Sequence, residues 1–228
     1  MAPAVTLFDI DGTLMRGSGP HHRQSLVEAV RRVTRLETTT ENVPVAGMLD
    51  RKILEEMLRN AGASARLMRR VMPQLVIQAQ REYLRHHPSC LRRAVCPGVR
   101  AAVRKLRRRG IPMGLVTGNF SRIGWKKLEL AGLKQFFRFG SFAEQAEERS
   151  SLVRIAMEKA RQHGWIVEHK RIWLIGDHPN DVAAAHANGI RVLAVATGLV
   201  SRSELEASRP DLVLDHLRDF HPEMLFPA

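Results

Sequence analysis

Two aspartates near the start of the chain are the first residues whose type and spacing could do chemistry. The run 5–8 is apolar apart from one threonine, and Asp9 and Asp11 follow it, with Gly12 directly after. A short apolar run bounded by a turn signal is typical of a strand buried on both faces of a parallel sheet. Ligands of open α/β sheets bind beyond the carboxyl ends of the strands, where both acids would stand. Because Gly12 permits a sharp turn, both could face one cation or one phosphoryl group, although an Asp-Gly turn without function fits the same residues.

A second apolar run, 113–116, ends in a hydroxyl and an amide. Thr117, Gly118 and Asn119 follow it, and a helical pattern begins two residues later. A hydroxyl at a strand tip and free backbone amides at a helix N-terminus form an oxyanion site. Here Thr117 would bind a phosphoryl oxygen, and Gly118 and Asn119 would contribute mainly main chain. Alone, the stretch also fits a helix N-cap at Asn119 and an ordinary strand residue at Thr117.

A third apolar run, 172–175, again ends in acids. Asp177 and Asp181 follow it in the pattern Gly-Asp-x-x-x-Asp. Mg²⁺ prefers oxygen ligands and is held through one or two carboxylates together with substrate phosphate and waters. Asp181 would support such a site from a distance, or would place a favourable charge in the first turn of its helix.

In this order the motifs resemble those of the haloacid dehalogenase (HAD) superfamily, in particular its phosphoglycolate phosphatase-like members with a helical cap. The resemblance covers nearly the full chain. It implies that Asp9 is the nucleophile of an aspartyl-phosphate mechanism. It also implies that Asp11 is the general acid that protonates the departing alkoxide and later activates water. Dehalogenases of the superfamily lack this second acid, so its presence indicates phosphoryl chemistry.

The resemblance further implies a cofactor and a basic residue. The cofactor would be Mg²⁺, held by the Asp9 carboxylate, the main-chain oxygen of Asp11, and Asp177. Superfamily members use a basic residue, usually lysine, to neutralise the nucleophile and the phosphoryl oxygens. The best candidate in this chain is Arg149, just before the helix that precedes the third motif. A surface arginine beside two glutamates is the alternative interpretation.

The elements that must position these residues fall into two groups. Residues 15–92 show apolar side chains at helical spacing, whereas helices and strands alternate from residue 97 onward. Such alternation predicts a parallel sheet with right-handed crossovers, and the resemblance implies the strand order 5-4-1-2-3. We therefore expect an α/β Rossmann-like core domain of residues 1–14 and 93–228, with an inserted all-helical cap domain of residues 15–92.

The cap contains one segment that resembles the loop through which the caps of the superfamily inspect the leaving group. It runs from Gly47 to Lys52 and precedes a helix. Asp50 is interpreted as the N-cap of that helix rather than as a substrate ligand. Arg51 could meet a second anionic group of the substrate.

Composition limits the possible partners. The 228 residues are 44% hydrophobic and carry a formal charge of +13. Such a charge alone would suggest nucleic acid, but the basic residues are spread along the chain, which favours a solvated surface that steers an anionic substrate. No window approaches 18 uncharged apolar residues, and the start lacks the features of a signal peptide, so we expect no membrane partner and a cytoplasmic location.

The sequence therefore predicts a Mg²⁺-dependent phosphatase that hydrolyses a small anionic phosphate ester, with phosphoglycolate as the nearest candidate, and that is a monomer or homodimer. A phosphomutase of the same superfamily is one alternative. A basic nucleic-acid-binding or scaffold protein on an inactive HAD fold is another. The intact set of Asp9, Asp11, Thr117 and Asp177 argues against the inactive fold.

Overall fold

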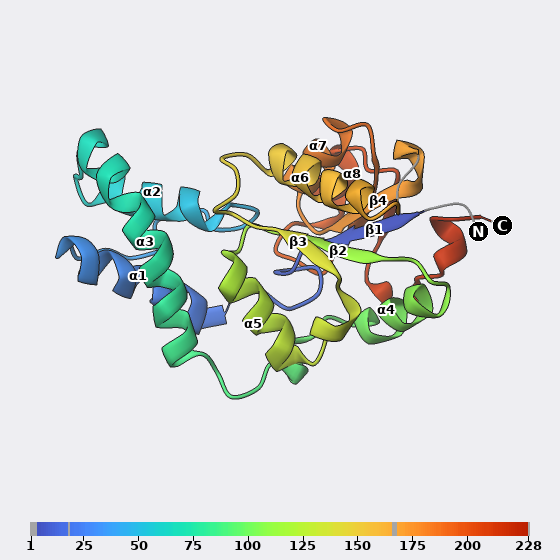
Figure 1. Ribbon diagram of the computed structural model, residues 1–228, viewed down its shortest axis with the longest axis horizontal. Coiled ribbons are helices and arrows are strands. Elements are labelled where there is room, and N and C mark those ends of the chain that lie inside the picture. The colour runs from blue at the N-terminus through green and yellow to red at the C-terminus, as the bar shows by residue number, and fades with distance from the viewer. Residues whose placement is uncertain (1–3, 18, 166–167, 228) are drawn as a thin grey trace.

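The core of the protein is a six-stranded parallel sheet with helices on both faces (Figure 1). The computed structural model describes residues 4–17, 19–165 and 168–227. The strand order is β3-β2-β1-β4-β5-β6. Read from the opposite edge, it is the predicted order with β6 added beside β5, so the predicted fold class and order are confirmed. The strands are β1 (Val5–Phe8), β2 (Met113–Val116), β3 (Phe139–Ser141), β4 (Ile172–Gly176), β5 (Arg191–Val195) and β6 (Leu212–Leu214).

The helices separate into a group beside the sheet and a group that covers it. In Figure 1, α1, α2 and α3 lie beyond the carboxyl ends of the strands, α6 and α7 cover one face of the sheet, and α4 lies against the other. The helices are α1 (Gly19–Thr34), α2 (Asp50–Asn60), α3 (Ala65–His86), α4 (Val99–Arg108), α5 (Ser121–Ala131), α6 (Arg149–Gln162), α7 (Pro179–His186) and α8 (Arg202–Ala207). Short 3₁₀ turns are formed by Arg92–Ala94, Lys134–Phe136, His169–Arg171, Leu217–Asp219 and Pro222–Met224.

Strand β1 is central because it is apolar on both sides. All four of its residues are buried, and it pairs with β2 on one edge and β4 on the other. Val5 and Leu7 belong to one hydrophobic cluster, whereas Phe8 belongs to the other. Alternate side chains of a strand point to opposite faces, so a continuous apolar run fills both layers at once. The chain therefore delivers Asp9 and Asp11 to the middle of one edge of the sheet.

The helical segment leaves and rejoins the core at one place. Met15 and Val95 form an antiparallel bridge, and the Cys96 amide donates to the Leu14 carbonyl at 3.0 Å. The two connections thus run side by side, close to the predicted boundaries of the cap. Residues 1–3 and 18, which belong to the predicted domains, lie outside the described residues, and the division into two domains stays a proposal.

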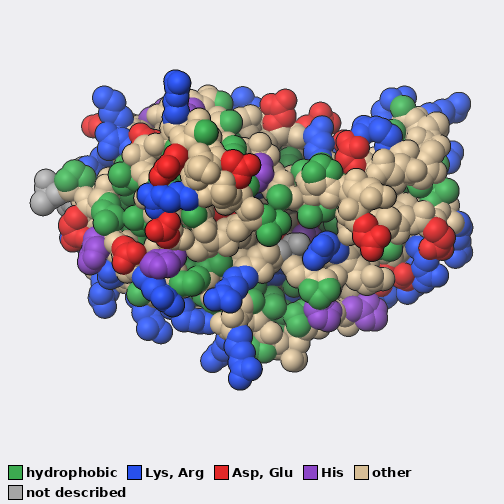
Figure 2. All heavy atoms as spheres, turned by 180° about the vertical axis from the view of Figure 1, so that it is seen from behind, with side chains coloured by type: hydrophobic (Ala, Val, Ile, Leu, Met, Phe, Trp, Pro, Cys, Tyr) green, Lys and Arg blue, Asp and Glu red, His purple; other side chains and the backbone are tan. Residues whose placement is uncertain are grey.

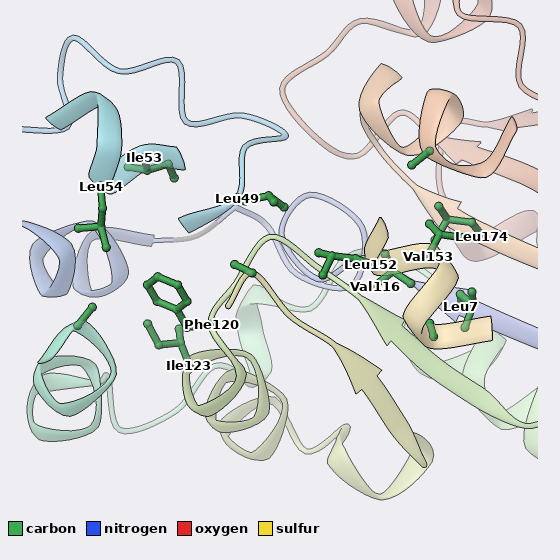
Figure 3. Close-up of a cluster of buried hydrophobic side chains, with 14 of the residues drawn as sticks. Leu7, Leu49, Ile53, Leu54, Val116, Phe120, Ile123, Leu152, Val153 and Leu174 are labelled. Carbon is green, nitrogen blue, oxygen red and sulfur yellow. The ribbon is translucent and has the colours of Figure 1, made fainter. Parts of the chain in front are cut away.

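The helical segment packs directly on the core. Figure 3 shows Leu49, Ile53 and Leu54 of the segment near Phe120 and Ile123 of the core, and all five belong to one buried hydrophobic cluster. Residues of the helical segment therefore lie against the loop that follows β2.

Basic side chains are distributed widely over the surface. In Figure 2, Lys and Arg side chains lie around the whole visible face and do not gather in a single patch. Of the helices in the described ranges, none is long and apolar enough to cross a membrane. On this face, the net positive charge is spread as the sequence predicted.

Candidate active site

A cavity lies where the carboxyl ends of the central strands meet the helical segment. Its volume is about 600 Å³, and its walls include Asp9 and Asp11 after β1, Asn119 after β2, Arg149 of α6 and Asp177 after β4. The three strands are neighbours in the sheet, so residues more than 100 positions apart in the sequence reach one space. Loops that follow three neighbouring strands therefore meet at one cavity.

Three buried acids lie close together at the cavity, and two of them, Asp9 and Asp177, line it. One carboxylate oxygen from each of Asp9, Asp177 and Asp181 lies within 4.8 Å of the others. Burial, reinforced by the neighbouring acids, raises the pKa of Asp9 to about 6 and that of Asp177 to about 8. These acids would therefore hold their negative charge at neutral pH more readily beside an additional cation.

The donor set of these acids fits a hard divalent ion. The Asp9 Oδ1 atom is buried and has no hydrogen-bond partner among the described residues. Asp177 is fixed from the opposite side, since Thr13 Oγ1 donates to its Oδ1 at 2.7 Å. Gly12 has φ of 92°, and a Cβ there would overlap the Asp177 carboxylate, so only glycine allows this approach. Buried carboxylate oxygens with unused acceptor capacity are what Mg²⁺ binds in proteins.

Arg149 lines the same cavity and is not a surface residue. Its side chain is buried, its Nη1 lies 3.5 Å from Asp9 Oδ2, and it donates to Asp181 Oδ1. Burial alone would lower the pKa of the guanidinium, but Asp181 and Asp9 raise it overall, so Arg149 remains charged. The surface interpretation of this residue is wrong, because Arg149 is the first residue of α6 rather than a residue before the helix, and its side chain is buried.

Asp181 positions Arg149 and also caps its own helix. Its Oδ2 accepts from the His178 amide at 3.2 Å, which completes a capping box at the start of α7. Asp181 therefore lies in the first turn of α7, as one of the two interpretations predicted, while its support of a metal site stays a prediction. Because both oxygens of Asp181 have protein partners, Asp9 and Asp177 are the better candidates for metal ligands.

The Asp11 side chain belongs to a separate group. Its Oδ2 accepts from Lys127 Nζ at 2.6 Å and from Asn119 Nδ2 at 3.0 Å. Burial alone would raise the pKa of Asp11, but the charge of Lys127 and these hydrogen bonds lower it overall. Asp11 is therefore an anion with its own buried cation, and its carboxylate is not a member of the three-acid group.

Sequence reasoning missed Lys127. The residue is 1% exposed although it looks like one of several lysines and arginines on an amphipathic helix. A signal was present, because the buried face of α5 includes Ile123, Leu128 and Ala131, and Lys127 falls on that same face. A lysine at a core position of a helix needs a buried partner, and Asp11 supplies it.

The segment after β2 differs from its predicted arrangement. Thr117 is fully buried, its Oγ1 accepts from Asn119 Nδ2 at 2.8 Å, and it is absent from the residues that line the cavity. Gly118 and Asn119 do line it, so the structure supports a substrate contact from them more directly than from Thr117. The N-cap interpretation of Asn119 is wrong, because the N-cap residue of α5 is Phe120 and the Asn119 side chain bonds Asp11 and Thr117 instead.

Two cap predictions are corrected. Leu49, not Asp50, is the N-cap residue of α2, and the Asp50 carboxylate accepts from the Phe120 amide at 2.8 Å across the boundary with the core. Arg51 does not line the cavity but pairs with Glu55 and Glu147, at 3.4 Å each. The structure gives no support to a substrate contact from Arg51, because its helix turns it toward these acids.

Known proteins with similar sequences are named as phosphatases. The phosphoglycolate phosphatase of Pseudomonas putida is 28% identical over 234 residues, which cover 99% of this chain and 81% of that protein. The phosphoglycolate phosphatase of Chromobacterium violaceum is 27% identical over 180 residues, covering 79% of this chain and 75% of that protein. The predicted resemblance to this kind of protein is confirmed.

Solved structures share the fold. A β-phosphoglucomutase from Clostridium difficile superposes with a TM-score of 0.71 at 16% identity, covering 99% of this chain and 96% of that one. A predicted phosphoglycolate phosphatase from Haemophilus somnus superposes with a TM-score of 0.67 at 20% identity, covering 95% of both chains. A family model described as haloacid dehalogenase-like hydrolase matches residues 4–189. With a match over most of its length, the chain belongs to the haloacid dehalogenase-like hydrolase family.

Proposed function

We propose that this protein is a Mg²⁺-dependent phosphatase that hydrolyses a small phosphate monoester through an aspartyl-phosphate on Asp9. The observation that carries the proposal is the meeting of Asp9, Asp177 and Arg149 at one wall of a cavity, with Asp11 on that cavity but in a separate hydrogen-bonded group. A nucleophile, a site for a cation and a separate proton donor are what displacement at phosphorus requires.

The metal would be held by the carboxylates of Asp9 and Asp177 and, as the family resemblance implies, by the main-chain oxygen of Asp11. Bound Mg²⁺ would neutralise charge on the nucleophile and the phosphoryl group. Arg149 adds a fixed positive charge on the same side, 3.5 Å from Asp9. Charge of this kind stabilises the transferring group without moving during the reaction.

The two aspartates have different tasks in the proposed reaction. An Asp9 oxygen forms a bond to phosphorus while the bond from phosphorus to the ester oxygen breaks, and Asp11 gives its proton to that oxygen. In the second half, the oxygen of a water molecule bonds to phosphorus while the bond from phosphorus to Asp9 breaks, Asp11 takes a proton from that water, and inorganic phosphate leaves. The lowered pKa of Asp11 keeps its carboxylate ionised, as a group that takes a proton from water must be. For the first half, an approaching phosphate dianion favours the protonated form of a neighbouring carboxylate.

The substrate we propose is small and carries a second anionic group. Arg16 and Arg23 line the cavity, and in the described part of the chain neither guanidinium has an ion-pair partner. A guanidinium without a carboxylate partner is available to bind an anionic group of a ligand bidentately. Relatives named phosphoglycolate phosphatase make phosphoglycolate, which has a carboxylate beside its phosphate ester, the first compound to test.

Release of inorganic phosphate from a panel of phosphate esters tests this function. We expect release that requires Mg²⁺, stops with a chelator, and is fastest for small esters with a carboxylate. A phosphomutase remains the second candidate because the β-phosphoglucomutase from Clostridium difficile shares the fold. It would convert a sugar phosphate to its isomer and release little phosphate. Absence of both products from every ester, with Mg²⁺ present and the protein folded, would refute the proposal.

A further inference from the structure

Lys127 is a buried cation that the proposed reaction does not yet use. It lies on α5 with 1% of its surface exposed, and its ammonium pairs with Asp11. Burying an ammonium ion without full hydrogen bonding costs several kcal/mol, so the buried position of Lys127 needs a physical explanation.

All three protons of the Lys127 ammonium have an acceptor. Its Nζ lies 2.6 Å from Asp11 Oδ2, 2.7 Å from Asn119 Oδ1 and 3.1 Å from His22 Nδ1. An ammonium group has three donors and no acceptor, so this set is complete. The position of Nζ is therefore fixed by three different segments: the loop after β1, the loop after β2 and helix α1.

The third acceptor is itself held by the cap. His22 Nε2 lies 3.0 Å from Asp50 Oδ2, and the same oxygen accepts from the Phe120 amide at 2.8 Å. If His22 Nε2 donates to this carboxylate, a neutral ring leaves Nδ1 as an acceptor toward Lys127. The Asp50 amide also donates to the Gly118 carbonyl at 2.7 Å. Cap residues thus complete a continuous set of hydrogen bonds that ends on Asp11.

The two oxygens of the Asp11 carboxylate are in different situations. Oδ2 accepts from Lys127 and Asn119, whereas Oδ1 is buried and has no hydrogen-bond partner among the described residues. Asp11 lines the cavity, so Oδ1 is the oxygen left for the proton that moves to or from the substrate. A carboxylate fixed through one oxygen presents the other in a defined place.

We propose that Lys127 is a positioning residue that fixes the Asp11 carboxylate through Oδ2, so that Oδ1 is aligned for proton transfer, with His22 and Asp50 of the cap holding the lysine. This inference rests on the proposed phosphatase function. Misplacement of a reacting group by about 1 Å can cost about a hundredfold in rate. Lys127 does not touch the substrate in this account and acts only through Asp11.

The first test varies the leaving group. Proton donation matters for an alkyl phosphate, whose alkoxide is a poor leaving group, and matters little for p-nitrophenyl phosphate. For Lys127→Met we expect kcat/KM to fall at least about thirtyfold with an alkyl phosphate and less than about fivefold with p-nitrophenyl phosphate. General damage to the site would lower both values by the same factor.

The matched control is the neighbouring lysine. Lys126 lies on the same helix, but its ammonium pairs with Glu129 at 2.7 Å on the outside of the protein. Lys126→Met should leave both kcat/KM values unchanged within about twofold, since a surface ion pair contributes little.

The second test is a double-mutant cycle with Asp11. Asp11→Asn removes the proton donor, so adding Lys127→Met to it should cause less than about a threefold further loss with the alkyl phosphate. The double variant also removes both buried charges, which keeps the test possible if Lys127→Met alone fails to fold. His22→Ala should show the leaving-group pattern of Lys127→Met with a smaller loss, because it removes one of three acceptors.

The outcomes separate this proposal from the function on which it rests. Suppose that the wild-type protein hydrolyses phosphate esters. If Lys127→Met then lowers kcat/KM by the same factor for both substrates, Lys127 does not act by positioning Asp11. The same conclusion follows if Lys127→Met lowers the kcat/KM of the Asp11→Asn variant by as large a factor as that of the wild-type protein. Should the wild-type protein release no phosphate from any ester, it is the phosphatase function that fails.

Discussion

The two aspartates at the end of β1 have opposite surroundings although one residue separates them. Asp9 shares the guanidinium of Arg149 with two other buried acids, and its pKa is raised by burial. Asp11 has the ammonium of Lys127 largely to itself, and its pKa is lowered. The Asp9 group, which consists of Asp9, Asp177, Asp181 and Arg149, therefore has more acids than cations. The Asp11 group pairs one acid, Asp11, with one cation, Lys127.

This difference shows that the environment, rather than the residue type, assigns chemical roles. The Asp9 group leaves charge that a divalent cation would neutralise, which suits a nucleophile that acts as an anion beside a metal ion. The Asp11 group is complete without a metal, which suits a residue that exchanges a proton with substrate and water.

Removing the nucleophile should have the largest effect. Asp9→Asn fills the same volume but is a poor nucleophile, so we expect a loss of at least about a thousandfold in kcat for phosphate release. Circular dichroism should show an unchanged fold. Retention of ordinary activity by this variant would contradict the role of Asp9 and remove the contrast with Asp11.

Removing the other candidate metal ligand should come next. For Asp177→Asn we expect at least about a hundredfold loss of activity at low Mg²⁺ and partial recovery as Mg²⁺ is raised, because one carboxylate ligand is gone. Asp11→Asn serves as the comparison, since its loss should not recover with added Mg²⁺. The same Mg²⁺ response in both variants would show that the two groups are not separate.

The fixed cation of the Asp9 group should have a smaller effect. Arg149→Ala should lower kcat by at least about tenfold, as removal of a contact to the transition state does. The substitution also removes the guanidinium that pairs with the buried Asp181, so thermal unfolding should be measured alongside the kinetics. Unchanged kinetics in a folded variant would mean that Arg149 is not the basic residue of the reaction.

The smallest effect concerns the stability of the metal-free protein. The pKa values of Asp9 and Asp177 are raised by burial from 3.8 to about 6 and about 8, so the folded state binds these protons more tightly than the unfolded state. Stability from such groups is lost as pH rises through the folded pKa values. We expect the unfolding midpoint of the chelator-treated protein to fall by a few degrees between about pH 5 and about pH 9.

Magnesium provides the control for this pH effect. Mg²⁺ binds the ionised carboxylates of the folded state, so adding Mg²⁺ at about pH 9 should reverse most of the fall in the unfolding midpoint. Asp177→Asn should show a weaker dependence on both pH and Mg²⁺. A midpoint that rises with pH in the metal-free wild-type protein would contradict the assigned environment of the Asp9 group.

The sequence by itself determined the fold and the acids of the site. The apolar runs before Asp9 and Asp177 identify strands buried on both faces, and parallel strands bring their carboxyl ends to one edge. These local patterns and a general rule of sheet architecture predict a parallel sheet with acids at one edge, whereas the strand order and the roles of the acids were implied by the family resemblance. The helical insertion was visible for the same reason, because its apolar spacing differs from that of the core.

Only the tertiary structure decided which cation serves which acid. The family resemblance suggested Arg149 as the cation beside Asp9, but a surface arginine fitted the same residues, and only its buried position in the structure separates the two interpretations. Lys127 resembles a surface residue in the sequence, and nothing local shows that it meets Asp11. Asp50 likewise looks like a helix cap, yet it bonds the core across the cap boundary. Such pairings join segments separated by 70 or more positions, as for Asp50 with Phe120. They depend on how side chains are buried together, and that is fixed only when the cap and the sheet pack against each other.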